Sequence, residues 1–198
     1  MKQRIPETNE GIQGEWDVNA FNEFQRRMRD RGWIETKQVA ASGIDRGHAL
    51  EVGPGPGYLG LEWLKATTGT RLTGLEISAN MIAVARENAH DYGFDESRCR
   101  YVQGSALQMP FEADLFDGVF TNGSLHEWER PQDVLRGIVR VVKSGGRFFI
   151  SDLRRDARLP VKLFLSCSAN KAMRAGLKTS LQAAYTKAEL EGMIQAVP

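Results

Sequence analysis

The sequence has few cysteines and histidines and lacks a long apolar run. Its two cysteines, Cys99 and Cys167, lack Cys-x-x-Cys spacing, which excludes a redox pair or a zinc half-site and fits reduced thiols. The three histidines, His48, His90 and His126, lack the spacing of metal ligands, so no metal site is predicted. The N-terminus is polar, and no run approaches the roughly 18 apolar residues that a membrane span needs. We therefore expect a cytoplasmic protein that is neither secreted nor inserted in a membrane.

An excess of one charge is also lacking. Lys and Arg number 26 against 25 Asp and Glu, for a formal net charge of +1. Such a balance gives no long-range field toward nucleic acid or an anionic membrane, so neither is an expected partner. The local basic cluster of Arg26, Arg27, Arg29 and Arg31 is more typical of a solvated helix face than of a phosphate contact.

What is present is the composition of a folded globular domain. Hydrophobic residues make up 41% and charged residues 26% of the 198 positions, without repeats, low-complexity tracts or linkers. We predict one domain over residues 1–198. It comprises an N-terminal helical region (1–46), a core (47–152) and a helical C-terminal region (153–198).

Strand and helix patterns alternate along this core. Short apolar runs predict strands at 48–52, 71–76, 100–103, 115–121 and 147–152. Apolar residues at helical spacing predict helices at 58–64, from the N-cap Ser78 onward, and at 132–142 with a helix-ending turn at 143–146. Outside the core, residues 17–43 predict two helical pieces that meet near Gly32, and Thr186 with Glu189 predicts a capping box.

This alternation predicts the α/β class. We expect a doubly wound, Rossmann-like, mainly parallel sheet in three layers, with an N-terminal helical cap. Ligands of such sheets bind beyond the carboxyl ends of the strands, where the strand order reverses. The residues that follow each strand should therefore carry the chemistry.

The segment Glu51–Gly57 follows the first of these strands. Its glycines, with Gly60, match the dinucleotide pattern GxGxxG, and with Glu51 they match an acid-x-Gly-x-Gly-x-Gly pattern. A loop that cradles phosphate presents backbone N–H groups, and Pro54 and Pro56 remove two of them. Glu51 adds a negative charge. Both features oppose a pyrophosphate and suit a ligand that is neutral or cationic at this point.

Glu76 ends the second predicted strand, 19 residues after Gly57. A carboxylate at this place can accept hydrogen bonds from both hydroxyls of a ribose, as in dinucleotide domains and other nucleoside sites. An exposed acid at a strand end is the alternative. Together with the glycine turn, Glu76 predicts a nucleoside cofactor.

The order and spacing of five segments resemble the successive motifs of the class I S-adenosylmethionine-dependent methyltransferases. The chain is most similar to the small-molecule branch with a methyltransferase type 11 domain, and the resemblance covers about His48 to Asp152. The five segments are Glu51–Gly57, Leu75–Ser78, Gly104–Phe111, Phe116–Phe120 and Lys143–Arg147.

The resemblance implies S-adenosylmethionine as cofactor, with S-adenosylhomocysteine as product. The glycines of the turn would let the backbone approach the methionine part, with Glu51 near its ammonium and Glu76 on the ribose. Two apolar side chains would flank the adenine, although Met81 also fits the core, and the family often has an acid where Ser105 stands. The implied cofactor residues are Glu51, Gly53, Pro54, Gly55, Gly57, Glu76, Ile77, Met81, Ser105, Ala106 and Asn122.

His126 is the best-placed candidate for a catalytic residue. It follows the fourth predicted strand, where the family lines the space between cofactor and substrate. Methyl transfer depends mainly on alignment, and a general base helps when the acceptor is a hydroxyl or an acidic carbon. The alternative is a packing or capping histidine beside Trp128.

The C-terminus departs from the family pattern. The family adds an antiparallel hairpin after the helix that begins near Thr186, and only four residues follow Ile194. We therefore expect a sheet without this hairpin. Its uncovered edge would either pair with a second copy in a homodimer or lie under the segment Leu159–Leu181.

The predicted function is methyl transfer to a small-molecule acceptor. One alternative is methylation of tRNA or protein. Another is an NAD-dependent oxidoreductase that uses Gly55, Gly57, Gly60 and Glu76. A last alternative is a methyltransferase-like protein that binds the cofactor without turnover.

Overall fold

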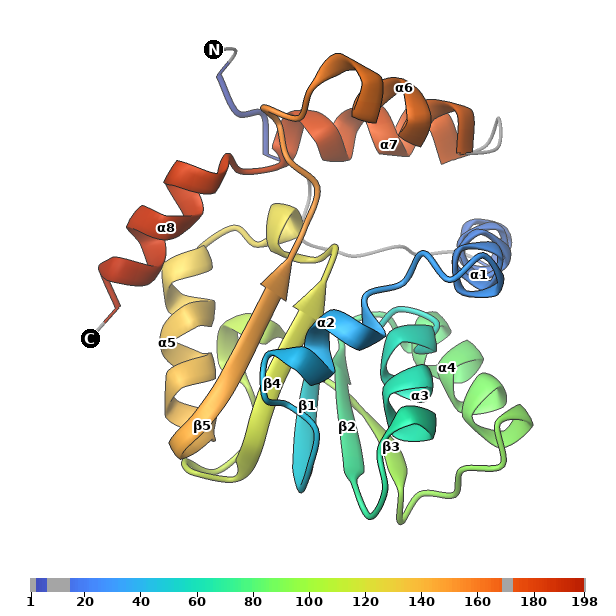
Figure 1. Cartoon of the computed structure of the whole chain (residues 1–198), viewed down its shortest axis with the longest axis vertical. Helices are drawn as coiled ribbons and strands as arrows, with labels where there is room; N and C mark the ends of the chain where they lie inside the picture. Colours follow the sequence, from blue (N-terminus) through green and yellow to red (C-terminus); the bar gives the residue numbers. More distant parts are fainter. Residues whose placement is uncertain (1–2, 7–14, 169–172, 198) are drawn as a thin grey trace.

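A computed structural model describes residues 3–6, 15–168 and 173–197. They contain one parallel five-stranded sheet with strand order β3-β2-β1-β4-β5 (Figure 1). The strands are β1 (His48–Val52), β2 (Arg71–Glu76), β3 (Cys99–Gln103), β4 (Phe116–Asn122) and β5 (Val142–Ser151). The chain runs outward from β1 to β3 and returns to β4 on the other side of β1. All strand pairings in these residues are parallel, which confirms the predicted doubly wound fold.

The helices fall in the predicted regions. Before the sheet come α1 (Glu15–Asp30) and α2 (Thr36–Ala41), which confirm the two helical pieces; Gly32, between them, has a left-handed φ of 68°. Within the sheet region lie α3 (Tyr58–Ala66), α4 (Ala79–Asp91) and α5 (Pro131–Val141), with short 3-10 turns η1 (Ala106–Gln108) and η2 (Leu125–Glu127). After the sheet come α6 (Leu159–Ser168), α7 (Met173–Ala183) and α8 (Lys187–Gln195).

The core has one apolar cluster on each face of the sheet. Successive side chains of a strand point to opposite faces, so Ala49 joins one cluster and Leu50 the other. The first cluster lies under α2, α3 and α4, and the second under α5 and α8. These two helix layers and the sheet between them are the three predicted layers.

Helix starts follow the predicted capping residues. The Ser78 hydroxyl accepts a hydrogen bond from the Met81 N–H at 3.3 Å and so fixes the start of α4. Thr186 and Glu189 form a reciprocal capping box at α8. Both helices therefore begin where the sequence predicts.

The predicted helix-ending turn at residues 143–146 is wrong as a separate element. Helix α5 ends at Val141, and β5 begins at once. Val142 pairs with Phe116 and Arg147 with Gly118, so the four residues 143–146 bulge opposite Asp117. The Lys143 Nζ lies 2.7 Å from the Asp117 carboxylate and holds this bulge in place.

Helices α6 and α7 lie beyond the carboxyl ends of the strands (Figure 1). Helix α7 contacts η2, which follows β4, and α6 contacts α7. The segment Leu159–Leu181, as far as it is described, thus covers the ligand-binding end of the sheet. None of the described helices is both long enough and apolar enough to cross a membrane.

Candidate functional site

Two adjoining cavities open at the carboxyl ends of the strands. The first cavity, of about 170 Å³, lies over the ends of β1, β2, β3 and β4. The second cavity, of about 720 Å³, lies among α1, η2, α6 and α7. Five residues line both: Phe21, Gln25, Asn122, Gly123 and Glu127. The two spaces therefore meet at the point where the strand order reverses.

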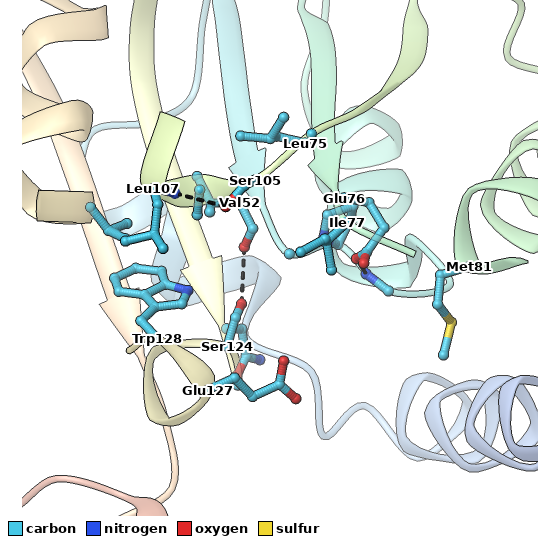
Figure 2. Close-up of a pocket in the computed structure, with 18 of the residues that line it drawn as sticks. Val52, Leu75, Glu76, Ile77, Met81, Ser105, Leu107, Ser124, Glu127 and Trp128 are labelled. Atoms are coloured by element: carbon cyan, nitrogen blue, oxygen red, sulfur yellow. Dashed lines mark hydrogen bonds between the residues drawn. The ribbon is translucent and has the colours of Figure 1, made fainter. Parts of the chain in front are cut away.

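The first cavity brings together most of the predicted cofactor residues, although they come from four separate strand ends (Figure 2). Glu51 and Gly57 are not among its lining residues. The nine that do line it are Gly53, Pro54, Gly55, Glu76, Ile77, Met81, Ser105, Ala106 and Asn122.

The turn after β1 depends on glycine at three positions. Gly53, Gly55 and Gly57 have φ values of 67°, 53° and 86°, in the left-handed region that disfavours side chains. A Cβ on Gly53 would lie 2.8 Å from the Ser124 Cβ and closer still to its hydroxyl. A Cβ on Gly57 would overlap the Tyr101 hydroxyl. Gly53 and Gly55 thus expose bare backbone to the cavity, and Gly57 allows the turn to pack on β3.

Glu51 lies buried behind this turn and is only 2% exposed. The backbone N–H of Gly60, in the first turn of α3, favours the charged form of its carboxyl, but its Oε2 atom is buried without a hydrogen-bond partner among the described residues. Burial, with a smaller contribution from the nearby Glu76, raises the pKa of Glu51 to about 8. An unsatisfied acidic oxygen beside the turn is suited to a cationic group.

Glu76 holds the turn to the end of β2. Its Oε2 accepts the Gly55 N–H at 3.0 Å and its Oε1 accepts the Ser78 N–H at 2.9 Å. Burial raises the pKa of this carboxyl, and the backbone N–H groups oppose the increase. Glu76 lines the first cavity, so its carboxylate both organises the loop and faces the ligand space.

The far side of the first cavity is apolar. Ile77 is partly exposed there, whereas Met81 is buried and also contributes to the core side of α4. The Ser105 hydroxyl accepts the Leu107 N–H at 3.2 Å and caps η1. Ser105 therefore has a structural role in addition to its place in the wall.

Several lining residues escaped the sequence analysis. Phe21 and Gln25, one helical turn apart on α1, close the cavity from a helix distant in sequence. Leu107 and Trp128 lie together at the opposite wall in Figure 2, with Ser124 and Glu127 nearby. Trp128 was noted only as a neighbour of His126. The rule that ligands bind beyond the carboxyl ends of strands does not point to α1. The only sequence signal for this helix was its row of apolar residues.

The second cavity has a mixed lining that is largely apolar. Phe21, Phe24 and Met28 recur at helical spacing on α1 and face it together with residues of α6 and α7. Ile5 and Pro6 line it from the N-terminal segment, which is tied down by a hydrogen bond from the Ile5 N–H to the Gln182 carbonyl. A cavity of this size and lining is typical of a small-molecule site.

His126 lines the second cavity and pairs with Asp152. Its Nδ1 lies 2.7 Å from one oxygen of that carboxylate, and its backbone N–H donates to the other at 2.7 Å. Both side chains are about 5% exposed. His126 lies in η2, after β4, in agreement with its predicted place after the fourth strand, and Asp152 follows β5. The sequence analysis assigned no role to Asp152, although an acid directly after a strand was a usable signal.

The charges of the first cavity oppose a diphosphate ligand. Among its described lining residues are Glu76, Glu127 and Glu129 but no Lys or Arg. No group of three or more His, Cys, Asp or Glu among the described residues could hold a metal ion that would offset this charge. The site therefore fits a nucleoside with a cationic tail better than NAD.

Residues 50–150, half of the chain, match the family model described as a methyltransferase domain. The chain belongs to the class I S-adenosylmethionine-dependent methyltransferases. S-adenosylmethionine is the cofactor of this family, and the first cavity fits it: the Glu76 carboxylate, bare glycine backbone and apolar walls. At about 170 Å³ the first cavity alone is smaller than most sites for a molecule of this size, and it continues into the second cavity through the five shared residues.

The chain is 32% identical over 121 residues to erythromycin 3''-O-methyltransferase from Saccharopolyspora erythraea, covering 61% of this chain and 39% of that protein. It is 30% identical to the ubiquinone/menaquinone biosynthesis C-methyltransferase UbiE of Pseudoalteromonas translucida, covering 73% of this chain and 57% of that protein. Among solved structures, the [4+2]-cyclase SpnF shares the fold, with a TM-score of 0.66 and 22% identity over 79% of this chain and 64% of that one. The chain thus spans less than two thirds of the length of these relatives.

Proposed function

We propose that the methyltransferase transfers a methyl group from S-adenosylmethionine to a small-molecule acceptor bound in the second cavity. The observation that carries this proposal is the junction of the two cavities at Phe21, Gln25, Asn122, Gly123 and Glu127. A cofactor in the first cavity and an acceptor in the second would meet there. The O- and C-methyltransferase names of the relatives support the reaction class.

In this proposal the turn and the strand ends hold the cofactor. Gly53, Gly55 and Pro54 border the methionine part, with Glu51 behind them as the partner of its ammonium. Glu76 accepts the ribose hydroxyls. Ile77 and Met81 flank the adenine, Ser105 and Ala106 border its edge, and Asn122 faces the junction. The arrangement of nine of these residues around one cavity supports the assignment.

The chain's main contribution to the reaction is alignment. When bound, S-adenosylmethionine supplies a methyl group on a positively charged sulfur, which is already a strong electrophile. The apolar wall of the second cavity orients the acceptor and excludes water, and Glu127 at the junction provides a carboxylate close to the reacting region. Holding the acceptor atom at roughly 3 Å from the methyl carbon supplies most of the rate increase.

His126 serves as the general base when the acceptor atom carries a proton. In the tautomer in which Nδ1–H donates to Asp152, Nε2 is the nitrogen that takes this proton. Asp152 then orients the ring and balances the charge that the ring acquires. The position of the pair in the wall of the second cavity supports this role.

The open edge of β5 is the proposed surface for a homodimer. β5 is the last strand of the described sheet, and Phe148 on it is exposed. Such an edge offers unpaired backbone groups to a second copy. Sedimentation equilibrium of the wild type and of Phe148→Lys tests this, with a monomeric wild type as the result that contradicts it.

Two measurements test the function. Calorimetric titration with S-adenosylhomocysteine and with NADH should show binding of the first only; binding of NADH alone would overturn the proposal. Incubation with methyl-labelled S-adenosylmethionine and a fractionated metabolite extract should label a low-molecular-weight product. Label in tRNA or protein would redirect the acceptor class, and cofactor binding without any labelled product would indicate a protein without turnover.

A further inference from the structure

The second cavity carries an unbalanced set of ionisable side chains. Its described lining residues include the carboxylates of Glu35, Glu127 and Asp152 together with His126, but no Lys or Arg. Asp152 is engaged with His126. An anionic ligand would therefore enter a largely apolar space without a cationic partner and against acidic groups, which is costly in a low-dielectric site.

Glu35 has an acidic oxygen without a partner. It precedes α2 as its N-cap residue but makes no side-chain capping hydrogen bond. Its Oε2 atom is buried and lacks a hydrogen-bond partner among the described residues, although the side chain lines the second cavity. A buried carboxylate oxygen without a donor leaves a desolvation cost that a cationic ligand would remove.

Aromatic rings surround the same space. Phe21, Phe24 and Trp33 line the second cavity, and Phe21 and Phe24 lie with ring centroids 6.3 Å apart. The faces of such rings attract cations. Trp33 already shows this behaviour, because the Arg31 guanidinium lies 4.9 Å from its ring centroid. Rings combined with carboxylates are a common way to bind an ammonium group.

Two basic side chains, Arg4 and Arg27, are sequence neighbours of lining residues and make contacts of their own. Arg4 donates to the carbonyl oxygens of Ala183 and His126 at 2.6 and 2.9 Å and lies over the Tyr185 ring. Arg27 pairs with Glu23 on the outer part of α1. Neither guanidinium is among the described lining residues of the second cavity, so neither offers an acidic acceptor a counter-charge in its wall.

From these features we infer that the acceptor of the methyl group is a bulky, mainly apolar molecule that carries a basic amine. The amine lies between the Glu35 carboxylate and the aromatic rings, and the apolar body fills the space between α1 and α6–α7. Molecules of the same shape with a carboxylate or phosphate are excluded. This inference rests on the proposed function and names the chemical class of its acceptor.

Three ring-bearing probes that differ in charge test the inference. Binding of 1-pyrenemethylamine, 1-pyrenemethanol and 1-pyreneacetate is measured by fluorescence anisotropy on the full chain saturated with S-adenosylhomocysteine. We expect the amine to bind at least tenfold more tightly than the alcohol, and the carboxylate to bind most weakly. Equal binding of amine and carboxylate would overturn the inference.

Glu35→Gln should reduce the preference for the amine over the alcohol to less than threefold, with binding of the alcohol unchanged. Glu96→Gln is the matched control, because Glu96 is exposed in the connection between α4 and β3. A preference for the amine that persists in Glu35→Gln would show that the amine binds elsewhere, for example on exposed apolar residues of α6, and would contradict the inference. Saturation with S-adenosylhomocysteine reports separately on the proposed function: loss of that binding would count against the function, whereas loss of the amine preference alone counts only against the acceptor class.

Discussion

His126 and Asp152 are joined by two contacts that cross from the end of β4 to the end of β5. The imidazole Nδ1 and the backbone N–H of His126 each lie 2.7 Å from a different oxygen of the same carboxylate. Asp152 also accepts the Leu153 N–H at 2.6 Å. The ring is therefore fixed in one orientation at the wall of the second cavity, as a general base requires.

The first prediction concerns this pair. His126→Ala should lower kcat by about 100-fold or more with an acceptor that loses a proton, and the affinity for S-adenosylhomocysteine should stay within about twofold. Asp152→Asn should lower kcat and change its pH profile, and Asp152→Glu should restore part of the activity. Labelled-methyl kinetics across pH 6 to 9 measure these effects. Unaltered turnover in His126→Ala would leave only a structural role.

The second prediction separates backbone strain from steric overlap. Gly53→Ala should destabilise the fold by about 2 to 4 kcal/mol, because the left-handed φ costs about 1 kcal/mol and the overlap with Ser124 adds the rest. Gly69→Ala has nearly the same φ, 69°, but open space around its Cβ, and should lose only about 1 kcal/mol. Urea denaturation measures both. Equal losses would contradict the close packing of Ser124 on the turn.

The third prediction concerns Glu76. Glu76→Ala should weaken binding of S-adenosylhomocysteine by about 1 to 3 kcal/mol, through loss of ribose hydrogen bonds and of the Gly55 and Ser78 anchors. Glu76→Gln, which keeps an acceptor oxygen, should lose less. Calorimetry with the exposed Glu87→Ala as control measures the difference. An affinity unchanged in Glu76→Ala would argue against this location of the ribose.

The fourth prediction is a pH dependence that arises from Glu51. Its pKa is raised from 4.5 to about 8, so between these values the folded protein keeps a proton that the unfolded chain has lost. The free energy of unfolding should therefore fall as pH rises through this interval, by up to about 1.4 kcal/mol per pH unit from this group. Glu51→Gln removes this contribution, and its stability relative to the wild type should increase from pH 5 to pH 8. Denaturation at pH 5, 6.5 and 8 checks this against Glu87→Gln, and a difference that does not vary with pH would refute it.

The strands, the main helices and the cofactor motifs could be predicted because each depends on local pattern. Alternation of apolar runs marks β1 to β5, and Ser78 and Thr186 cap helices through hydrogen bonds to residues three positions away. Strand ends of a parallel sheet converge at one edge, so Gly53, Glu76 and Ser105 were expected to meet. The bulge at residues 143–146 was mistaken for a turn because glycines mark both features.

The sequence alone was enough to predict the doubly wound fold, the methyl donor and the residues that follow β1, β2, β3 and β4. Three features depend on contacts between segments that are distant in the sequence and were found only in the structure. Phe21 of α1 closes the first cavity, Asp152 contacts the His126 ring, and Glu35 contributes an oxygen without a hydrogen-bond partner among the described residues. The physical reason is the sequence separation between the residues that interact. Strands and caps are set by neighbours within a few residues, whereas a cavity wall is set by packing between helices whose separation in sequence carries no periodic signal.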